Sequence, residues 1–142
     1  MREILFRGKR KDNGEWIEGF AYEHEAPLTC FANDPKEKSK WYIVRTAFAD
    51  WGLPRKVEMI EVVPETLGQF VGKTDKNGVK IFEGDIVSYN NSHEVVRWNT
   101  EIVPCFCLGI GGGSSTAFHP YKISKRHVVV GNVHDNPELL GA

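Results

Sequence analysis

The stretch "DKNGVKIFEGDIVSY" (residues 75–89) carries two turn signals beside two strand-like runs, and no helix-length pattern separates them. Asn77-Gly78 is typical of a tight β-hairpin, because both residues tolerate the positive φ that primed turns require. Gly84 can reverse the chain again, and Asp85 can accept a backbone N–H within that second turn. These patterns predict structural turn roles for four residues: Asn77, Gly78, Gly84 and Asp85.

Short strands surround these turns. Strand-like runs occupy residues 68–74, 79–82, 86–89 and 94–98, and turn residues separate them every few positions. A meander this tight tends to curl into a small barrel. We therefore expect a barrel in the C-terminal part of the chain, in which Trp98, Val128 and Val130 are largely buried.

A second Asn-Gly hairpin is predicted near the start of the chain. The segment "FRGKRKDNG" (residues 6–14) aligns without gaps on "FVGKTDKNG" (residues 70–78), and Phe, Gly, Lys, Asn and Gly coincide. We interpret the two segments as hairpins of the same type. Turn chemistry alone selects Asn-Gly, so convergence and an internal repeat both remain open.

The rest of the chain completes a mostly β prediction. Residues 41–48 and 57–63 have the pattern of strands, and residues 127–133 that of a buried final strand. Two prolines and a charged run before residue 40 indicate a long exposed loop. We expect a smaller, β-rich N-terminal region with this loop at residues 1–62, and the C-terminal barrel at residues 63–142.

Composition and charge place the chain among soluble globular proteins. Hydrophobic residues make up 41% of the chain, and 18 Lys and Arg oppose 19 Asp and Glu. A protein that binds nucleic acid through its phosphates usually carries net positive charge, so this balance disfavours that class. No run reaches the ~20 apolar residues of a membrane span. With three cysteines, at least one cannot join an internal disulfide, so we expect a cytoplasmic protein with no membrane partner.

Three blocks of sequence resemble the YopX family of phage and prophage proteins. They are "MREILFRG" at the start, "ETLGQFVGKTDKNGVKIFEGDIV" in the centre and "VVGNVHDNPELL" near the end, in the order and spacing of the family. The resemblance implies a C-terminal SH3-type β-barrel, a phage or prophage origin and self-association. It implies no activity, cofactor or catalytic residue, because the family has no assigned function. Segments 20–56 and 99–125 match no family block, so a member-specific role would lie there.

The motifs that could carry catalysis or bind a metal are weak. Residues 109–116 are rich in glycine like a phosphate-binding loop, but they lack its Gly-Lys-Ser/Thr ending. Cys105 and Cys107 would share one face of a strand, yet a structural zinc site needs two further ligands, usually a second close pair. Buried cysteines without metal are the favoured interpretation. We predict no catalytic residue, no metal site and no cofactor, and we expect a protein that is not an enzyme.

A nucleic-acid-binding small β-barrel is the alternative function. Basic residues cluster in "RGKRK" on the expected first hairpin loop, and the candidate contacts are Arg7, Lys9, Arg10 and Lys11. Exposed aromatic residues can stack on bases in small barrels, and the chain has four tryptophans. The balanced charge disfavours this function, and a solvated turn is the simpler interpretation of the basic cluster.

The favoured function is that of a non-enzymatic assembly or adaptor protein that acts through protein–protein contacts with phage or host proteins. Residues 41–48 combine Trp, Tyr, Ile and Val with a single charge and no proline, so this strand has few defences against edge pairing. We predict a symmetric homo-oligomer with four interface residues: Trp41, Tyr42, Ile43 and Val44. In the alternative, this strand pairs inside the N-terminal sheet and fills the core of one subunit.

Overall fold

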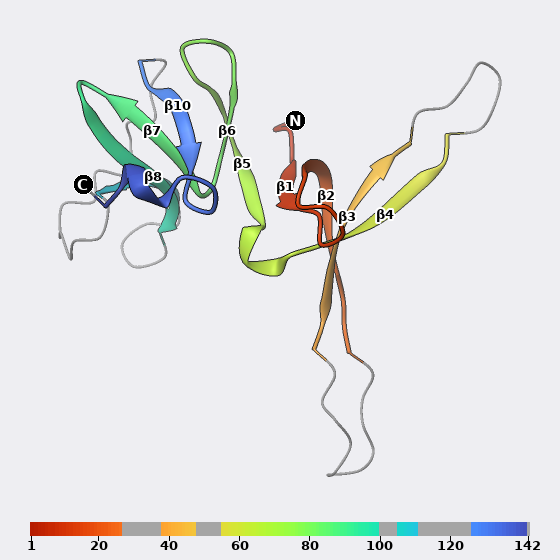
Figure 1. The fold of residues 1–142 in the computed structure, drawn as a ribbon. Coiled ribbons are helices and arrows are strands. Elements are labelled where there is room, and N and C mark those ends of the chain that lie inside the picture. The colour runs from red at the N-terminus through yellow and green to blue at the C-terminus, as the bar shows by residue number, and fades with distance from the viewer. Residues whose placement is uncertain (27–37, 48–54, 100–104, 111–125, 142) are drawn as a thin grey trace. The chain divides into compact units, whose positions relative to one another are not determined.

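The computed structural model describes residues 1–26, 38–47, 55–99, 105–110 and 126–141. Within them the fold is mostly β, which confirms the predicted class, and the paired strands run antiparallel. The chain divides into two units (Figure 1), one of Leu5–Leu67 and one of Met1–Ile4 with Gly68–Ala142. The division thus falls after Leu67, whereas the sequence prediction places it after residue 62.

The N-terminal unit, Leu5–Leu67, is an antiparallel sheet followed by a single turn of helix. Its described elements are β1 (Phe6–Lys9), β2 (Trp16–His24), β3 (Lys40–Thr46), β4 (Val57–Val62) and the 3₁₀ helix η1 (Pro64–Thr66). Consecutive strands are neighbours in the order β4-β3-β2-β1 (Figure 1). β3 therefore lies between β2 and β4 and is paired on both sides.

The end of β4 returns to the end of β1. Arg10 and Val62 form an isolated antiparallel bridge. Next to it, the backbone N–H of Lys11 donates to the carbonyl oxygen of Glu61 at 3.0 Å. The sheet therefore curls, and two segments that are far apart in sequence come to lie side by side at this point.

One face of the curled sheet forms the core of the N-terminal unit. Ile17, Ile43 and Val62 are buried, and partly buried apolar residues pack against them: Phe6, Ala21, Trp41, Ile60 and Leu67. Tyr42 and Val44 project from the opposite face, because successive residues of a strand alternate. The strand thus pairs inside the sheet and contributes Ile43 to the core of one subunit. The expectation of an unpaired edge at this strand is wrong, because its apolar side chains on one face are needed to build the core.

The C-terminal unit, Met1–Ile4 with Gly68–Ala142, contains a hairpin and a four-stranded sheet. Its described elements are β5 (Gly68–Thr74), β6 (Lys80–Phe82), β7 (Asp85–Tyr89), β8 (Ser92–Asn99), β9 (Cys105–Ile110), β10 (Val128–Asn132) and the 3₁₀ helix η2 (Pro137–Leu139). β5 pairs with β6, and the sheet has the order β10-β7-β8-β9 (Figure 1).

Asn77 and Gly78 lie in the turn between β5 and β6. The N–H of Gly78 donates to the carbonyl of Asp75 at 3.1 Å, and Gly78 has a φ of 81°. Asn77 keeps a negative φ, since the non-glycine residues with positive φ are two others. The turn is therefore not of the primed type, in which both central residues have positive φ, but has a glycine bulge after an ordinary turn.

Gly84 and Asp85 lie at the turn between β6 and β7. Gly84 has a φ of 84°, and Oδ2 of the buried Asp85 accepts the backbone N–H of Phe82 at 2.8 Å. Around this turn the core of the C-terminal unit gathers its buried residues Ile81, Val87, Val96 and Leu108, with Val71, Phe106 and Val129 packed against them. The turns at Gly78 and Gly84 thus connect β5, β6 and β7, which all contribute residues to one core.

The described strands of the C-terminal unit do not close into a barrel. The burial prediction is wrong for Trp98, which is 43% exposed, and for Val130, which is 41% exposed, while Val128 is partly buried. Val130 occupies a shift in the register between β10 and β7, and the extra residue of such a bulge has no partner in the ladder. Trp98 lies near the end of β8 outside the core cluster. Its ring packs edge-on against the ring of Phe106, with 4.8 Å between the two ring centres.

Candidate functional site

One face of the N-terminal sheet carries a row of apolar and aromatic side chains and faces away from the core. Phe20, Val44 and Met59 lie opposite one another on β2, β3 and β4. In the next row along the sheet, Tyr22 lies opposite Tyr42. Residues that are directly opposite on antiparallel strands project from the same side of the sheet. We call these five residues the outer face.

The outer face is solvent-exposed in a single chain. Phe20 is 61% exposed and Met59 is 53% exposed, and Tyr22 is exposed as well. Val44 fills the middle of the row between them and is half-buried. Large contiguous apolar patches are uncommon on soluble monomers and are typical of surfaces that bind another molecule.

The four predicted interface residues divide between the two faces of β3. Tyr42 and Val44 belong to the outer face. Ile43 is fully buried in the core, and Trp41 packs against that core. A contact with another protein can therefore use Tyr42 and Val44 directly, whereas Ile43 is unavailable in the folded unit.

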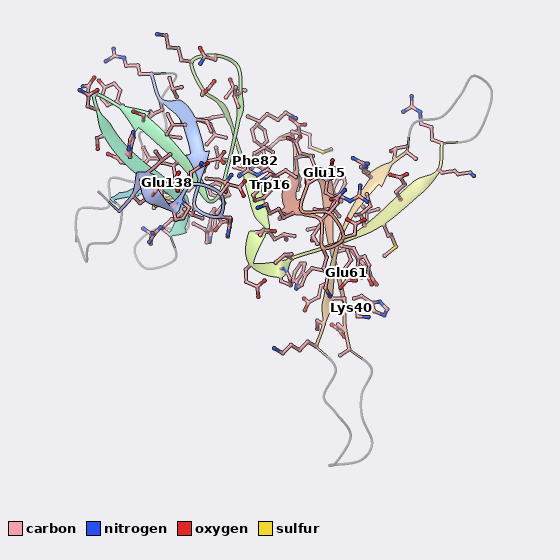
Figure 2. All side chains as sticks on the ribbon, viewed as in Figure 1. Glu15, Trp16, Lys40, Glu61, Phe82 and Glu138 are labelled. Carbon is pink, nitrogen blue, oxygen red and sulfur yellow. The ribbon has the colours of Figure 1, made fainter. Side chains whose placement is uncertain are left out.

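Two of the basic residues predicted to contact nucleic acid lie over one tryptophan. The guanidinium carbon of Arg7 is 4.6 Å from the centre of the Trp16 ring, and the ammonium nitrogen of Lys9 is 5.7 Å from it. Figure 2 labels Trp16 on β2. Both cations are within the range of an attractive interaction with the ring. The Trp16 ring is therefore in contact with side chains of its own unit, which opposes the stacking of a base on that side.

The other two basic residues are held in ion pairs. Arg10 donates to Asp12 through Nε at 2.9 Å and through Nη2 at 2.6 Å. The ammonium of Lys11 donates to Oε1 of Glu61 at 2.7 Å. This hydrogen bond raises the pKa of Lys11 and lowers the pKa of Glu61. Each cation is thus already close to a carboxylate, which opposes the approach of a phosphate.

A pocket of about 420 Å³ opens beside the Lys11–Glu61 pair. Its charged and aromatic lining consists of Lys11, Lys38, Lys40, Trp41, Glu61 and Glu65, and we call it the lysine pocket. Val62 and Pro64 add apolar surface. Figure 2 labels Lys40 and Glu61, which come from β3 and β4. A second hollow of about 370 Å³ is also lined by Lys11 and Glu61, so this ion pair borders both.

Cys105 and Cys107 come from β9, opposite Asn99 and Arg97 of β8. Cys107 is buried, and this burial, with a smaller effect of Cys105, raises the pKa of its thiol. A raised pKa disfavours the thiolate that metals and electrophiles require. Among the described residues, no three His, Cys, Asp or Glu side chains gather as a metal site. The glycine-rich residues 111–116 lie outside the described part of the chain.

The described part of the chain contains no helix with the length and apolar character to cross a membrane.

Sequence reasoning missed the lysine pocket, because its residues meet only in the folded sheet. Lys11 follows β1, Trp41 lies on β3 and Glu65 lies on η1, and the return of β4 to β1 brings them together. The outer face had a readable signal. Phe20 and Tyr22 are two positions apart, the spacing of residues on one face of a strand, and a core residue lies between them. Tyr42 and Val44 have the same spacing on β3.

Comparison with known proteins relates the chain to a protein family and to a solved structure. The sequence model of the family described as YopX protein matches residues 5–141. The fold is similar to that of protein EF1440 from Enterococcus faecalis, known from a crystal structure, with a TM-score of 0.49 and 23% identity over 99% of each chain. No curated protein matches the sequence.

Proposed function

Since the chain belongs to the YopX family, we propose that it is a phage- or prophage-related assembly or adaptor protein. It is not an enzyme, uses no cofactor and acts through protein–protein contacts in the cytoplasm of a bacterial host cell. It associates into a symmetric homo-oligomer and also contacts a phage or host protein. The observation that supports this proposal is the outer face, because that surface is apolar and uncovered in one chain.

A second copy of the chain is the occupant that the outer face fits best. A two-fold axis over β3 would place the row Phe20–Val44–Met59 of one subunit against the same row of the other. Full burial of such side chains contributes about 1.5–3 kcal/mol each, and a stable interface buries about 1,200–2,000 Å² in total. The aromatic residues and Met of the outer face are the types enriched at such interfaces.

The β4 strand offers a second means of association. It is the last strand of the order β4-β3-β2-β1. In the described residues its far side is paired at one end, where Arg10 and Lys11 meet Val62 and Glu61. The rest of that edge has backbone groups that a strand from another chain can pair with. The predicted edge pairing is therefore reassigned from β3 to β4.

Light scattering at micromolar concentration tests the assembly. We expect a mass that is a multiple of 16.1 kDa for the natural sequence. The double variant Phe20→Ser/Met59→Ser removes two exposed apolar side chains without opening a core cavity, so it should fold and have a mass close to one chain. A mass of one chain for the natural sequence would contradict the homo-oligomer.

Val130→Ser is the matched control, because it also removes an exposed apolar side chain but lies on β10 in the other unit. It should leave the mass unchanged. If both variants retain the mass of the natural sequence, the outer face is not the interface, and β4 becomes the surface to test.

Nucleic-acid binding is the second candidate function. The half-exposed Trp98 on β8 favours it, and Arg97 beside it is exposed. The ion pairs of Arg10 and Lys11 oppose it. Binding to single-stranded DNA or RNA that weakens steeply with added salt would support this function. The absence of binding at low ionic strength would exclude it.

We also propose that the C-terminal unit is an SH3-type barrel. Support comes from the short strands β5 to β10, from the tight turns at Gly78 and Gly84 and from one common core. An experimental structure of residues 68–142 tests this topology directly, and an open sheet without a second, crossing layer would contradict it.

A further inference from the structure

The lysine pocket has two ammonium groups without an ion pair among the described residues. Among the described residues, no carboxylate lies within ion-pair distance of Lys38 or Lys40, whereas Lys11 is paired with Glu61 at 2.7 Å. Lys40 begins β3 and Lys38 lies two residues before it, and both line the pocket. The pocket therefore presents a pair of cations to its contents.

The remaining lining gives the pocket an apolar wall. Trp41 is partly buried and packs against the core of the unit, which holds the indole in place. Val62 and Pro64 line the pocket as well. The volume of about 420 Å³ lies within the range of about 300–1,000 Å³ that is typical of ligand pockets. A ligand with an apolar group beside an acidic group would satisfy both parts of the lining.

The acidic residues limit how much negative charge the ligand can carry. Glu61 is neutralised by Lys11, and the nearby Lys40 also lowers the pKa of Glu61. Glu65 is exposed and has no cation partner among the described residues. A nucleotide phosphate would bring further negative charge toward Glu65, whereas a peptide brings one carboxylate for the lysines and N–H donors for Glu65.

We infer that the lysine pocket binds a segment of a partner protein in which an acidic residue adjoins apolar residues. The carboxylate of the segment lies between Lys38 and Lys40, and an apolar side chain packs on Trp41. This inference rests on the proposed function in that the ligand belongs to a protein partner. The pocket uses other residues than the outer face, although its Glu61 lies opposite Tyr42. Loss of peptide binding with the oligomer retained would therefore count against this inference alone.

Nuclear magnetic resonance of the full chain labelled with nitrogen-15 tests the inference. The probe is the peptide acetyl-Leu-Glu-Leu-amide, and its match without charge is acetyl-Leu-Gln-Leu-amide. We expect the acidic peptide to shift the backbone amide signals of residues 38–41, 61–63 and 65 in a saturable way. The neutral peptide should bind about fivefold more weakly, the effect of losing two partly exposed ion pairs. Equal shifts from both peptides, or none from either, would overturn the inference.

The double variant Lys38→Gln/Lys40→Gln should bind the acidic peptide as weakly as the natural sequence binds the neutral one. Arg55→Gln/Lys56→Gln is the matched control, because it also removes two exposed positive charges but does not line the pocket. It should retain full binding, and an equal loss in the control would show only general attraction of charge, against the inference.

Two further probes separate the peptide from other anions. Inorganic phosphate and adenosine monophosphate are titrated under the same conditions, and both should bind more weakly than the acidic peptide. Tighter binding of phosphate would reduce the pocket to a general anion site. Tighter binding of the nucleotide would assign it to nucleotides, and either result overturns the peptide assignment. The readout is the comparison of ligands at the amides of residues 38–41, 61–63 and 65 in one sample of the full chain, so all ligands meet the same state of assembly.

Discussion

The two Asn-Gly hairpins have almost the same sequence, yet they are held in different ways. The first turn has the order Lys11-Asp12-Asn13-Gly14, and the second has the order Asp-Lys-Asn-Gly at residues 75–78. In the first, the exposed carboxylate of Asp12 accepts a hydrogen bond from the partly buried Arg10. In the second, Asp75 is only 4% exposed. The two turns therefore differ in the order of Asp and Lys. The aspartate is at the surface where it comes second and buried where it comes first.

The position of the aspartate within the turn explains this difference. Oδ1 of Asp75 accepts the N–H of Asn77 at 2.7 Å and the N–H of Val79 at 2.9 Å, and Oδ2 accepts the N–H of Val129 at 3.1 Å. A carboxylate at the first position of a turn is placed to accept these donors. One step later in the sequence, Asp12 cannot reach the equivalent groups. The second hairpin is thereby tied to β10, 54 residues further along the chain.

The hydrogen bonds that close the two loops differ as well. The N–H of Arg10 donates to the carbonyl of Glu15 in the first hairpin, and the N–H of Asp75 donates to the carbonyl of Val79 in the second. The gapless alignment would make position 11, not Arg10, the equivalent of Asp75. The first loop is thus longer, and the interpretation of two hairpins of one type is wrong. Shared Asn-Gly letters alone do not indicate an internal repeat here.

The largest expected effect is that of Asp75→Ala. It removes the acceptor of three backbone N–H groups in a buried position, and we expect it to destabilise the C-terminal unit by about 3 kcal/mol. Amide hydrogen exchange of β7 and β8 measures this change without interference from the other unit. Lys76→Ala, in the same turn but exposed, is the control and should be nearly neutral. A loss from Asp75→Ala no larger than that from Lys76→Ala would remove the distinction between the two hairpins.

Acid should also destabilise the second hairpin, because protonation of Asp75 weakens the hydrogen bonds that its carboxylate accepts. Burial alone would raise the pKa of Asp75, but the N–H groups of Val129, Val79, Asn77 and Gly78 lower it overall. A carboxyl with a lowered pKa in the folded state contributes stability that is complete above its unfolded pKa of about 3.9 and is lost as the pH falls further. The free-energy difference between the natural sequence and Asp75→Asn should therefore shrink below about pH 4. A difference that stays constant from pH 6 to pH 3 would contradict this anchor.

Much of the fold was predictable, and the site was not. Asn77, Gly78 and Gly84 indicate turns through local chemistry, and the apolar periodicity of β2 to β8 indicates strands, so both are readable in sequence. The burial of Asp75 was not readable, because it depends on Val129 of a distant strand. The lysine pocket was hidden for the same reason, since Lys11 and Trp41 meet only when the sheet curls.

The two turn glycines should respond alike, in contrast to the two aspartates. Gly14 has a φ of 75° and Gly78 a φ of 81°, and an added Cβ would meet no atom within 4 Å at either. Alanine then costs only the strain of a left-handed backbone, about 1 kcal/mol in each hairpin. Urea unfolding of Gly14→Ala and Gly78→Ala, read by hydrogen exchange in the respective unit, measures both. A markedly larger loss of stability from Gly78→Ala would mean that the turn held by Asp75 cannot adjust its backbone. The two hairpins would then differ in backbone rigidity as well as in their aspartates.

The smallest expected effect is that of Asp12→Asn. The side chain of Asp12 is 61% exposed, and its hydrogen bond to Arg10 is the main reason that its pKa is lowered. Solvent screens such a pair, and its net contribution to stability is small. We expect a slight loss of stability in the N-terminal unit at low ionic strength and none at ~1 M salt, where the screening length is about 3 Å. Urea unfolding at both salt concentrations, followed through β2 and β3, measures this difference. A loss that matches Asp75→Ala and persists in salt would show that Asp12 also anchors its hairpin, and the order of Asp and Lys in the two turns would then not decide how they are held.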